Sequence, residues 1–339
     1  MAGQRPCASF RFDLVASLLS AWFAAGLFLD SWAHNNIPEL ETFFTPWHAV
    51  FYSGFVASAG WLCWPALGRL LAGERGAAVA PVGYGASLVA APAFAVAGVA
   101  DFAWHEVFGI EQGLSILFSP THLVLVITMG VIVTGPVRSR WDRPEGGWRE
   151  LPLLLSWAFA SLLALLFLQY GNALAWSPAA VVAVLSHPSE APGADDGAVR
   201  FLTGVVVTTV VLLSALLLLA RRGRVPVGAA LLLFAVAALL SGAVTGFGSW
   251  VWTVAVLVCG VLVEGLVWWL RPGVGGLRGW LLFGAAVPLV WWSVLMGVTV
   301  VSAGLPSVVE YWTGAPVVAS AVGLLLAAVV GARPVARVS

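Results

Sequence analysis

Apolar residues fill ten long segments of the chain, and short polar connections separate these segments. A helix needs about 20 residues to cross the hydrocarbon core of a bilayer, and each segment is long enough. The segments cover residues 13–33, 46–67, 81–104, 118–137, 151–171, 199–220, 225–246, 250–270, 279–303 and 315–333. Because lipid offers no hydrogen-bond partner to a free backbone group, the segments are expected to be helices. The pattern therefore predicts an all-α, polytopic membrane bundle of about ten transmembrane helices.

Composition supports this prediction and excludes several classes of protein. Of the 339 residues, 60% are hydrophobic and 9% are charged, whereas a typical soluble domain is about 25% charged. A soluble globular protein, a disordered chain and a nucleic-acid-binding protein are thereby excluded, and the lipid bilayer is the expected surrounding. The chain contains no Lys, so chemistry that needs a lysine Schiff base is excluded as well.

The arginines predict how the chain is oriented. Fifteen of the sixteen arginines fall in one set of alternating connections, and the other set holds only Arg200. Because positively charged loops stay in the cytoplasm, both termini are predicted to be cytoplasmic, which requires an even number of spans. The opposite connections are acidic. We expect an integral protein of a bacterial plasma membrane.

One polar pattern occurs twice in the first four spans. It reads Asp-x3-His, then a short connection containing Glu, then Ser or Thr followed by Pro-x-His. The first copy holds Asp30, His34, Thr45, Pro46 and His48, and the second holds Asp101, His105, Ser119, Pro120 and His122. We interpret spans one and two as a copy of spans three and four. This internal repeat of helical hairpins defines a module over residues 1–137, followed by a six-span bundle over residues 138–339.

Helix geometry places each set of three side chains at one membrane face. Asp30 and His34 are four residues apart and share a helix face, and the same holds for Asp101 and His105. The Ser or Thr is a typical N-cap and the Pro suits the first helical position, so the last His falls in the first turn of the next span. All six side chains are predicted to lie at the outer face of the membrane. They can form one crowded site, two three-ligand sites or a dimetal centre.

Two imidazoles and one carboxylate are a ligand set for transition metals. Non-haem iron and many copper or zinc sites use it, and four of the five histidines of the chain belong to the pattern. We predict that Asp30, His34, His48, Asp101, His105 and His122 are metal ligands. A purely structural Asp–His hydrogen bond or a proton relay is the alternative. Four nearby carboxylates are candidates to orient the imidazoles or join the coordination, or else are solvated loop charges: Glu39, Glu41, Glu106 and Glu111.

At these residues the sequence resembles the metal site in a membrane-embedded subunit of the particulate methane and ammonia monooxygenases. The shared pattern is Asp-x3-His followed by a His at the start of the next helical stretch, and it covers about 90 residues here. The resemblance implies copper bound by one Asp and two His near the outer membrane face. It carries over to the Asp30 set and again to the Asp101 set, and it implies other membrane subunits as partners.

Three functions are compatible with such a site. The leading hypothesis is a copper- or iron-dependent oxidoreductase, monooxygenase-like, that acts on a small or lipophilic substrate, with copper favoured. The first alternative is a transition-metal transporter or metal-delivery protein. Soft ligands for Cu(I) are few, since the chain has three Met and three Cys. The second alternative is a zinc-dependent membrane hydrolase. A structural or assembly protein is a further possibility.

The second half of the chain offers weaker signals. Gln169, Tyr170 and Asn172 cluster at the end of the fifth span, and Glu264 lies within the eighth. The cluster is compatible with a cavity lining, and Glu264 with a proton path. Hydrogen bonding between helices or anchoring at the membrane interface is the favoured interpretation of each of them.

Overall fold

A computed structural model describes residues 6–37, 44–109, 113–186 and 195–331, and these residues form helices and turns with no strand. The chain divides into two compact units, Met1–Leu163 and Ala164–Ser339. The boundary lies within one helix, α6 (Leu151–Phe167). The module boundary predicted at residue 137 rests on the sequence repeat and stays a prediction.

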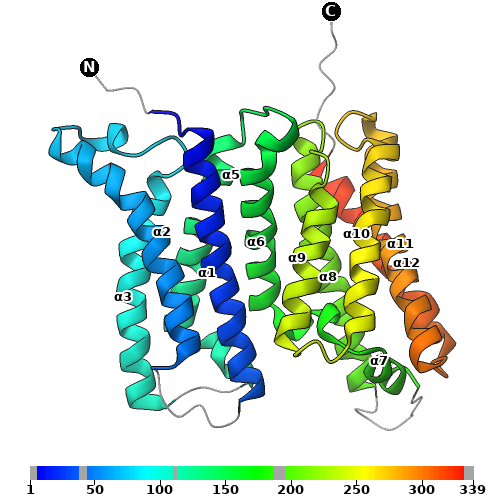
Figure 1. The fold of residues 1–339 in the computed structure, drawn as a ribbon. Coiled ribbons are helices and arrows are strands. Elements are labelled where there is room, and N and C mark those ends of the chain that lie inside the picture. The colour runs from blue at the N-terminus through cyan, green and yellow to red at the C-terminus, as the bar shows by residue number, and fades with distance from the viewer. Residues whose placement is uncertain (1–5, 38–43, 110–112, 187–194, 332–339) are drawn as a thin grey trace, which may run out of the picture. The chain divides into compact units, whose positions relative to one another are not determined.

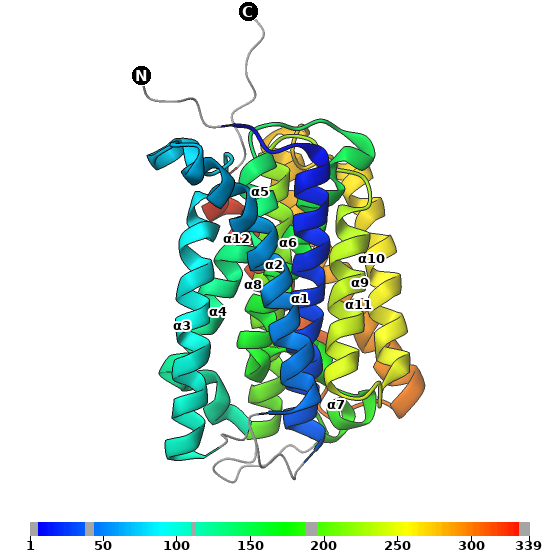
Figure 2. The same ribbon diagram turned by 60° about the vertical axis from the view of Figure 1, so that its left-hand side comes forward.

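Unit 1 is built from two helical hairpins. The first pairs α1 (Phe10–Asn36) with α2 (Pro46–Leu71), and the second pairs α3 (Gly85–Phe108) with α4 (Pro120–Val133). Both views in Figures 1 and 2 show α1 beside α2. A short α5 (Gly135–Arg140) follows α4, and single 3-10 turns lie at Gly76–Val79, Gly113–Phe118 and Gly147–Glu150.

Glycines bring α1 and α2 into close contact near the site. A Cβ atom on Gly26 would lie 2.7 Å from the Cα of Phe51, and one on Gly54 would lie 2.7 Å from the Cα of Phe23. Only glycine allows two helix backbones to approach this closely. Asp30 lies one turn after Gly26 and His48 one turn before Phe51, so this contact sets the distance between Asp30 and His48.

Aromatic rings fill the centre of unit 1. The ring centroids of Phe23 and Phe51 are 5.2 Å apart, and those of Phe55 and Phe94 are 4.4 Å apart. Phe23 and Phe94 meet edge to face at 5.1 Å. Buried aromatic pairs of this kind add to the packing energy of a core. The cluster joins α1, α2 and α3, and its residues lie about one to two helical turns from Asp30, His48 and Asp101.

An ion pair is buried at the opposite end of α1. The guanidinium of Arg140 donates a 2.7 Å hydrogen bond from Nε to Asp13 Oδ2, and Tyr84 donates one of 2.8 Å to Asp13 Oδ1. Asp13 and Arg140 are both almost completely buried. Because each carboxylate oxygen has a donor, the charge of Asp13 is satisfied and ties α1 to α5.

Unit 2 contains the remaining long helices. They are α8 (Asp196–Arg221), α9 (Ala229–Val244), α10 (Trp250–Leu270), α11 (Gly276–Ala303) and α12 (Val309–Val330), with a short α7 (Pro178–Val184) and 3-10 turns at Gln169–Gly171 and Ala173–Ala175. Helix α10 packs on α9 and on α11, and α12 packs on α11 and α8. Glu264 of α10 accepts hydrogen bonds from the backbone N–H groups of Gly228, Ala230 and Leu231. Its carboxylate therefore caps α9, and this contact between helices explains Glu264.

The prediction of a polytopic helical membrane protein is confirmed for the described residues. Nine helical stretches are long and apolar enough to cross a membrane. The segment predicted at 225–246 contains the shorter helix α9, which has 16 residues. The location of the termini, the even number of spans and the repeat stay predictions.

Candidate metal centre

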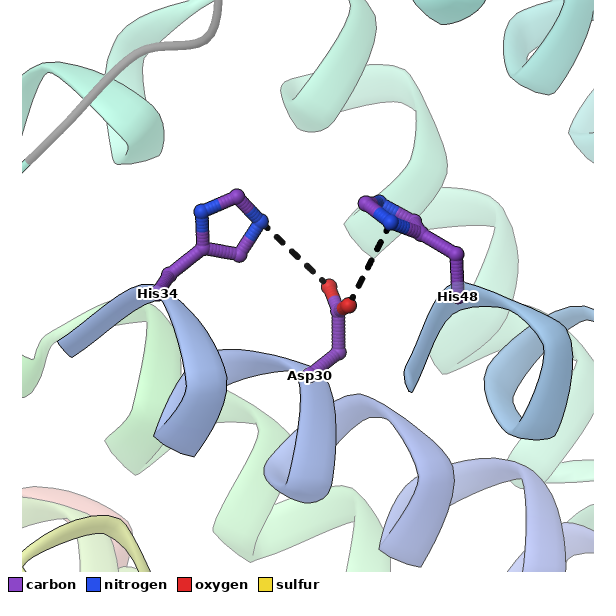
Figure 3. Close-up of side chains that lie close together, drawn as sticks. All are labelled: Asp30, His34 and His48. Carbon is purple, nitrogen blue, oxygen red and sulfur yellow. Dashed lines mark ion pairs between the residues drawn. The ribbon is translucent and has the colours of Figure 1, made fainter. Parts of the chain in front are cut away.

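Asp30 and His34 lie on one face of α1, near its C-terminal end, as their spacing predicts. The carboxylate of Asp30 is buried, and its Oδ2 lies 3.8 Å from Nε2 of His34. Helix α1 ends at Asn36, so the pair lies in the last two turns. Figure 3 shows both side chains turned toward the same space.

The third member, His48, comes from the first turn of α2. Thr45 caps α2, because its hydroxyl accepts a 3.2 Å hydrogen bond from the backbone N–H of His48. The imidazole Nδ1 of His48 then lies 3.6 Å from Asp30 Oδ1. Figure 3 shows His34 and His48 on either side of the Asp30 carboxylate. We call Asp30, His34 and His48 the first triad.

The Asp30 carboxylate is left with an unsatisfied oxygen. Its distances of 3.6 and 3.8 Å to the imidazole nitrogens exceed a normal hydrogen bond. Asp30 Oδ1 is buried and has no hydrogen-bond partner among the described residues. Burying such an atom costs free energy unless a partner or a cation satisfies it. The first triad therefore has the property expected of an anionic ligand that is arranged for a cation.

Asp101, His105 and His122 form a second triad between α3 and α4. Asp101 Oδ2 lies 3.5 Å from His105 Nε2, and Asp101 Oδ1 lies 3.3 Å from His122 Nε2. Ser119 caps α4 as Thr45 caps α2. The Asp101 carboxylate is almost completely buried, and it also accepts a 2.7 Å hydrogen bond from the hydroxyl of Thr121.

Backbone carbonyls orient both imidazoles of the second triad. Nδ1 of His105 lies 3.3 Å from the carbonyl oxygen of Gly109, and Nδ1 of His122 lies 2.8 Å from that of Ile116. A carbonyl only accepts, so each Nδ1 carries the hydrogen and donates it. Each Nε2 then faces the Asp101 carboxylate. Metal-binding histidines are commonly held in this way.

Both triads have the dimensions of a metal site. Each offers three ligand atoms that all lie within 4.8 Å of one another. Ligands about 2 Å from a metal ion lie about 3 to 3.5 Å apart, so small side-chain movements close either triad around an ion. The six residues form two groups of three, which favours two three-ligand sites over one crowded site.

Four nearby glutamates were predicted either to support the triads or to be solvated loop charges, and one of them lies among the described residues. Glu106 is exposed on α3 and makes no hydrogen bond or ion pair within the described part of the chain. It therefore has the features of a solvated charge. Glu39, Glu41 and Glu111 lie outside the described residues, and their role stays a prediction.

Two side chains near the triads were missed by the sequence reasoning. Thr121 lies inside the Ser-Pro-x-His motif, and its position corresponds to Trp47 in the first copy. Tyr52 lies one helical turn after His48; its ring stacks on that imidazole with centroids 6.2 Å apart. The signal that could have identified Tyr52 is its position four residues after His48, because side chains at this spacing share a helix face.

An apolar groove lies beside the second triad. It has a volume of about 590 Å³ and is lined by α3 and α4 through Pro92, Val96, Ala100, Pro120, Thr121 and Val124. Thr121 connects the groove with the site, because the same residue lines the groove and donates to Asp101. A small apolar molecule in this groove would lie one side chain away from the carboxylate.

Comparisons with protein-family models, with curated proteins and with solved structures find no match to this chain.

Proposed function

We propose that this chain is an integral membrane metalloprotein whose two Asp/His triads each bind a transition-metal ion. The observation that supports this most strongly is the buried Asp30 Oδ1, which has no hydrogen-bond partner among the described residues. His48 Nδ1 lies 3.6 Å from this oxygen, and His34 Nε2 lies 3.8 Å from the other oxygen, Oδ2. A metal ion bonded to Asp30, His34 and His48 would satisfy this oxygen. The second triad offers the same three ligand types.

Copper is our favoured metal, with iron or zinc as the alternatives. Imidazole suits all three metals, and a carboxylate with two histidines leaves positions open for a substrate or for oxygen. The resemblance to the copper site of the particulate monooxygenases favours copper. A copper or iron ion held here supplies redox chemistry and a Lewis acid.

We propose that the reaction is a monooxygenase-like oxidation of a small or lipophilic substrate. The apolar groove between α3 and α4 supports this, because it offers such a molecule a place next to the second triad. Thr121 and the carbonyls of Gly109 and Ile116 hold the carboxylate and the imidazoles in place. Asp30 and Asp101 contribute the negative charge that keeps a cation bound.

The function is tested with the purified protein in liposomes. The protein is loaded with copper, iron or zinc, supplied with oxygen and a lipid-soluble quinol as reductant, and given a short alkane. Incorporating one oxygen atom into a C–H bond consumes one O₂, two electrons and two protons, and releases one alcohol and one water. The quinol supplies the electrons and protons as it is oxidised to the quinone. We expect alcohol formation with copper or iron and none after Asp101→Ala. The exposed Glu106→Gln variant is the matched control and should retain activity.

Other outcomes would contradict the oxidoreductase. Metal accumulation inside the liposomes would identify a transporter. Hydrolysis of an ester or amide probe with zinc alone would identify a hydrolase. Alcohol formation that is equal in the wild type and in Asp101→Ala would show that free metal, and not the site, is responsible.

A further inference from the structure

A cavity lined by both polar and apolar residues lies in unit 2, in a part of the chain that the metal proposal does not use. Its volume is about 460 Å³, and its polar lining consists of Gln169, Asn172, Ser177, Thr245 and Ser249, together with the indole of Trp176. The residues that line it carry no charge. The volume lies in the range of pockets that hold small molecules. The sequence cluster of Gln169 and Asn172 is thus partly explained as a cavity lining.

The cavity exists because the chain does not continue as a regular helix after α6. It runs instead through two 3-10 turns, Gln169–Gly171 and Ala173–Ala175, and then enters α7. In a membrane protein, irregular backbone is tolerated where it packs against protein or lines a cavity. In several transporters, interrupted helices of this kind form the binding site.

Buried hydrogen bonds fix the wall of the cavity. The hydroxyl of Thr208 on α8 donates to the carbonyl of Gly171 and accepts from the N–H of Ala173, at 3.2 and 3.0 Å. The side-chain amide of Asn172 donates a 3.1 Å hydrogen bond to Ser241 of α9. Thr208 and Ser241 are both buried. The turn is therefore pre-organised, which lowers the entropic cost of binding a ligand.

Three groups on the lining keep unused hydrogen-bonding capacity. The Gln169 amide, the Ser249 hydroxyl and the Trp176 indole N–H form no hydrogen bond within the described residues. An amide supplies donors and acceptors, a hydroxyl supplies both, and an indole supplies a donor and an apolar face. With no charged side chain on the lining, an ionic ligand would be desolvated without a counter-charge.

We propose that this cavity binds an uncharged, hydroxyl-rich molecule of the sugar or polyol class. Each hydroxyl of such a ligand both donates and accepts, which matches the mixed capacity of Gln169 and Ser249. The C–H face of a sugar ring stacks on an indole such as that of Trp176. A free sugar and the sugar headgroup of a glycolipid share this chemistry. The inference is independent of the metal sites, because every lining residue belongs to unit 2.

The test measures sugar binding by the full-length protein in a polyoxyethylene detergent, because glucoside and maltoside detergents carry the same chemistry as the ligand. Tryptophan fluorescence and calorimetry follow titration with glucose, galactose, mannose, inositol and glycerol. We expect saturable binding of at least one probe, weakened about tenfold or more in Gln169→Leu and in Ser249→Ala. Ser302→Ala, an exposed serine of α11 that lies outside the cavity, is the matched control and should bind as the wild type does.

Two results would overturn the proposal. One is the absence of binding of every neutral probe at about 100 mM, a concentration about a hundredfold above the ~1 mM dissociation constant of a weak complex. The other is equal binding of glucose 6-phosphate and glucose, because a phosphate would be desolvated in a cavity without a cation. Liposomes with and without a glucosyl lipid distinguish the two sources. Competition between the lipid and free glucose indicates a headgroup site, and binding of free glucose alone indicates a solute site.

Discussion

The hydroxyl of Thr121 donates a 2.7 Å hydrogen bond to Oδ1 of Asp101. The first triad has no equivalent bond, because the corresponding residue is Trp47 and Asp30 Oδ1 has no hydrogen-bond partner in the described part of the chain. The two copies of the motif thus share their ligands and differ in what supports the carboxylate.

Thr121→Val removes the hydrogen bond to Asp101 and keeps the shape of the side chain. We expect the metal affinity of the second triad to fall about tenfold, the usual effect of losing a supporting hydrogen bond. The measurement is competition with a chelator, in a background in which His34→Ala and His48→Ala have removed the first triad. Thr121→Ser retains the hydroxyl and should retain the affinity. Equal affinities of the valine variant and the parent would show that this bond does not support the site.

Asp30→Asn has opposite effects on the metal-free and metal-bound forms. Without metal, the neutral amide replaces a buried, unsatisfied charge, so the free energy of unfolding should rise by about 1 to 3 kcal/mol. With metal, the variant should be less stable than the wild type, because a ligand is lost and binding no longer adds stability. Thermal unfolding with and without metal measures both effects. A loss of stability in the metal-free form would contradict the prediction.

Gly26→Val tests whether helix contact sets the geometry of the first triad. The added side chain would collide with the backbone of Phe51, which forces α1 and α2 apart. We expect the first triad to lose its metal while the second keeps it. Gly60→Ala is the control, since a Cβ atom there meets nothing within 4 Å. Normal metal binding by a folded Gly26→Val protein would refute this role of the contact.

Arg140→Ala should destabilise unit 1 without changing its metal content. Removing the partner of buried Asp13 leaves an uncompensated charge and typically costs about 3 to 5 kcal/mol. The additional change Asp13→Asn should recover part of this loss. Asp13 and Asp30 are 17 residues apart on α1, which corresponds to about 25 Å along a helix. Unfolding curves measure the change in stability, and metal analysis of the same preparations measures the metal content. A loss of metal in a folded Arg140→Ala protein would contradict the prediction that the ion pair does not affect metal binding.

Local rules were sufficient to predict much of the site. The i, i+4 spacing placed Asp30 beside His34, and the capping motif placed His48 in the first turn of α2. Contacts between distant segments were not predictable in this way. The supporting carbonyl of Ile116 belongs to a 3-10 turn, and the role of Thr121 depends on how α4 packs against α3. Their positions follow from tertiary packing, for which a single sequence carries no periodic signal.

The same limit explains the outcome for Glu264. A carboxylate within an apolar segment favoured hydrogen bonding between helices over a proton path, and Glu264 caps α9. The sequence could not name the partner, because the first residues of α9 lie more than thirty positions earlier in the chain. Sequence spacing predicts partners within one helix and not across two. The apolar pattern was sufficient to predict the long helices. The shorter α9 ends at Val244, just before the turn at Gly246, Phe247 and Gly248.

The most direct test of the account is the number of metal ions bound per chain. The purified protein is loaded with copper, passed through a desalting column and analysed for metal and protein. We expect about two ions for the wild type, about one after Asp30→Ala or Asp101→Ala, and none when both changes are combined. A wild type that retains no metal, or a double variant that retains as much as the wild type, would contradict the claim that these two triads are metal sites.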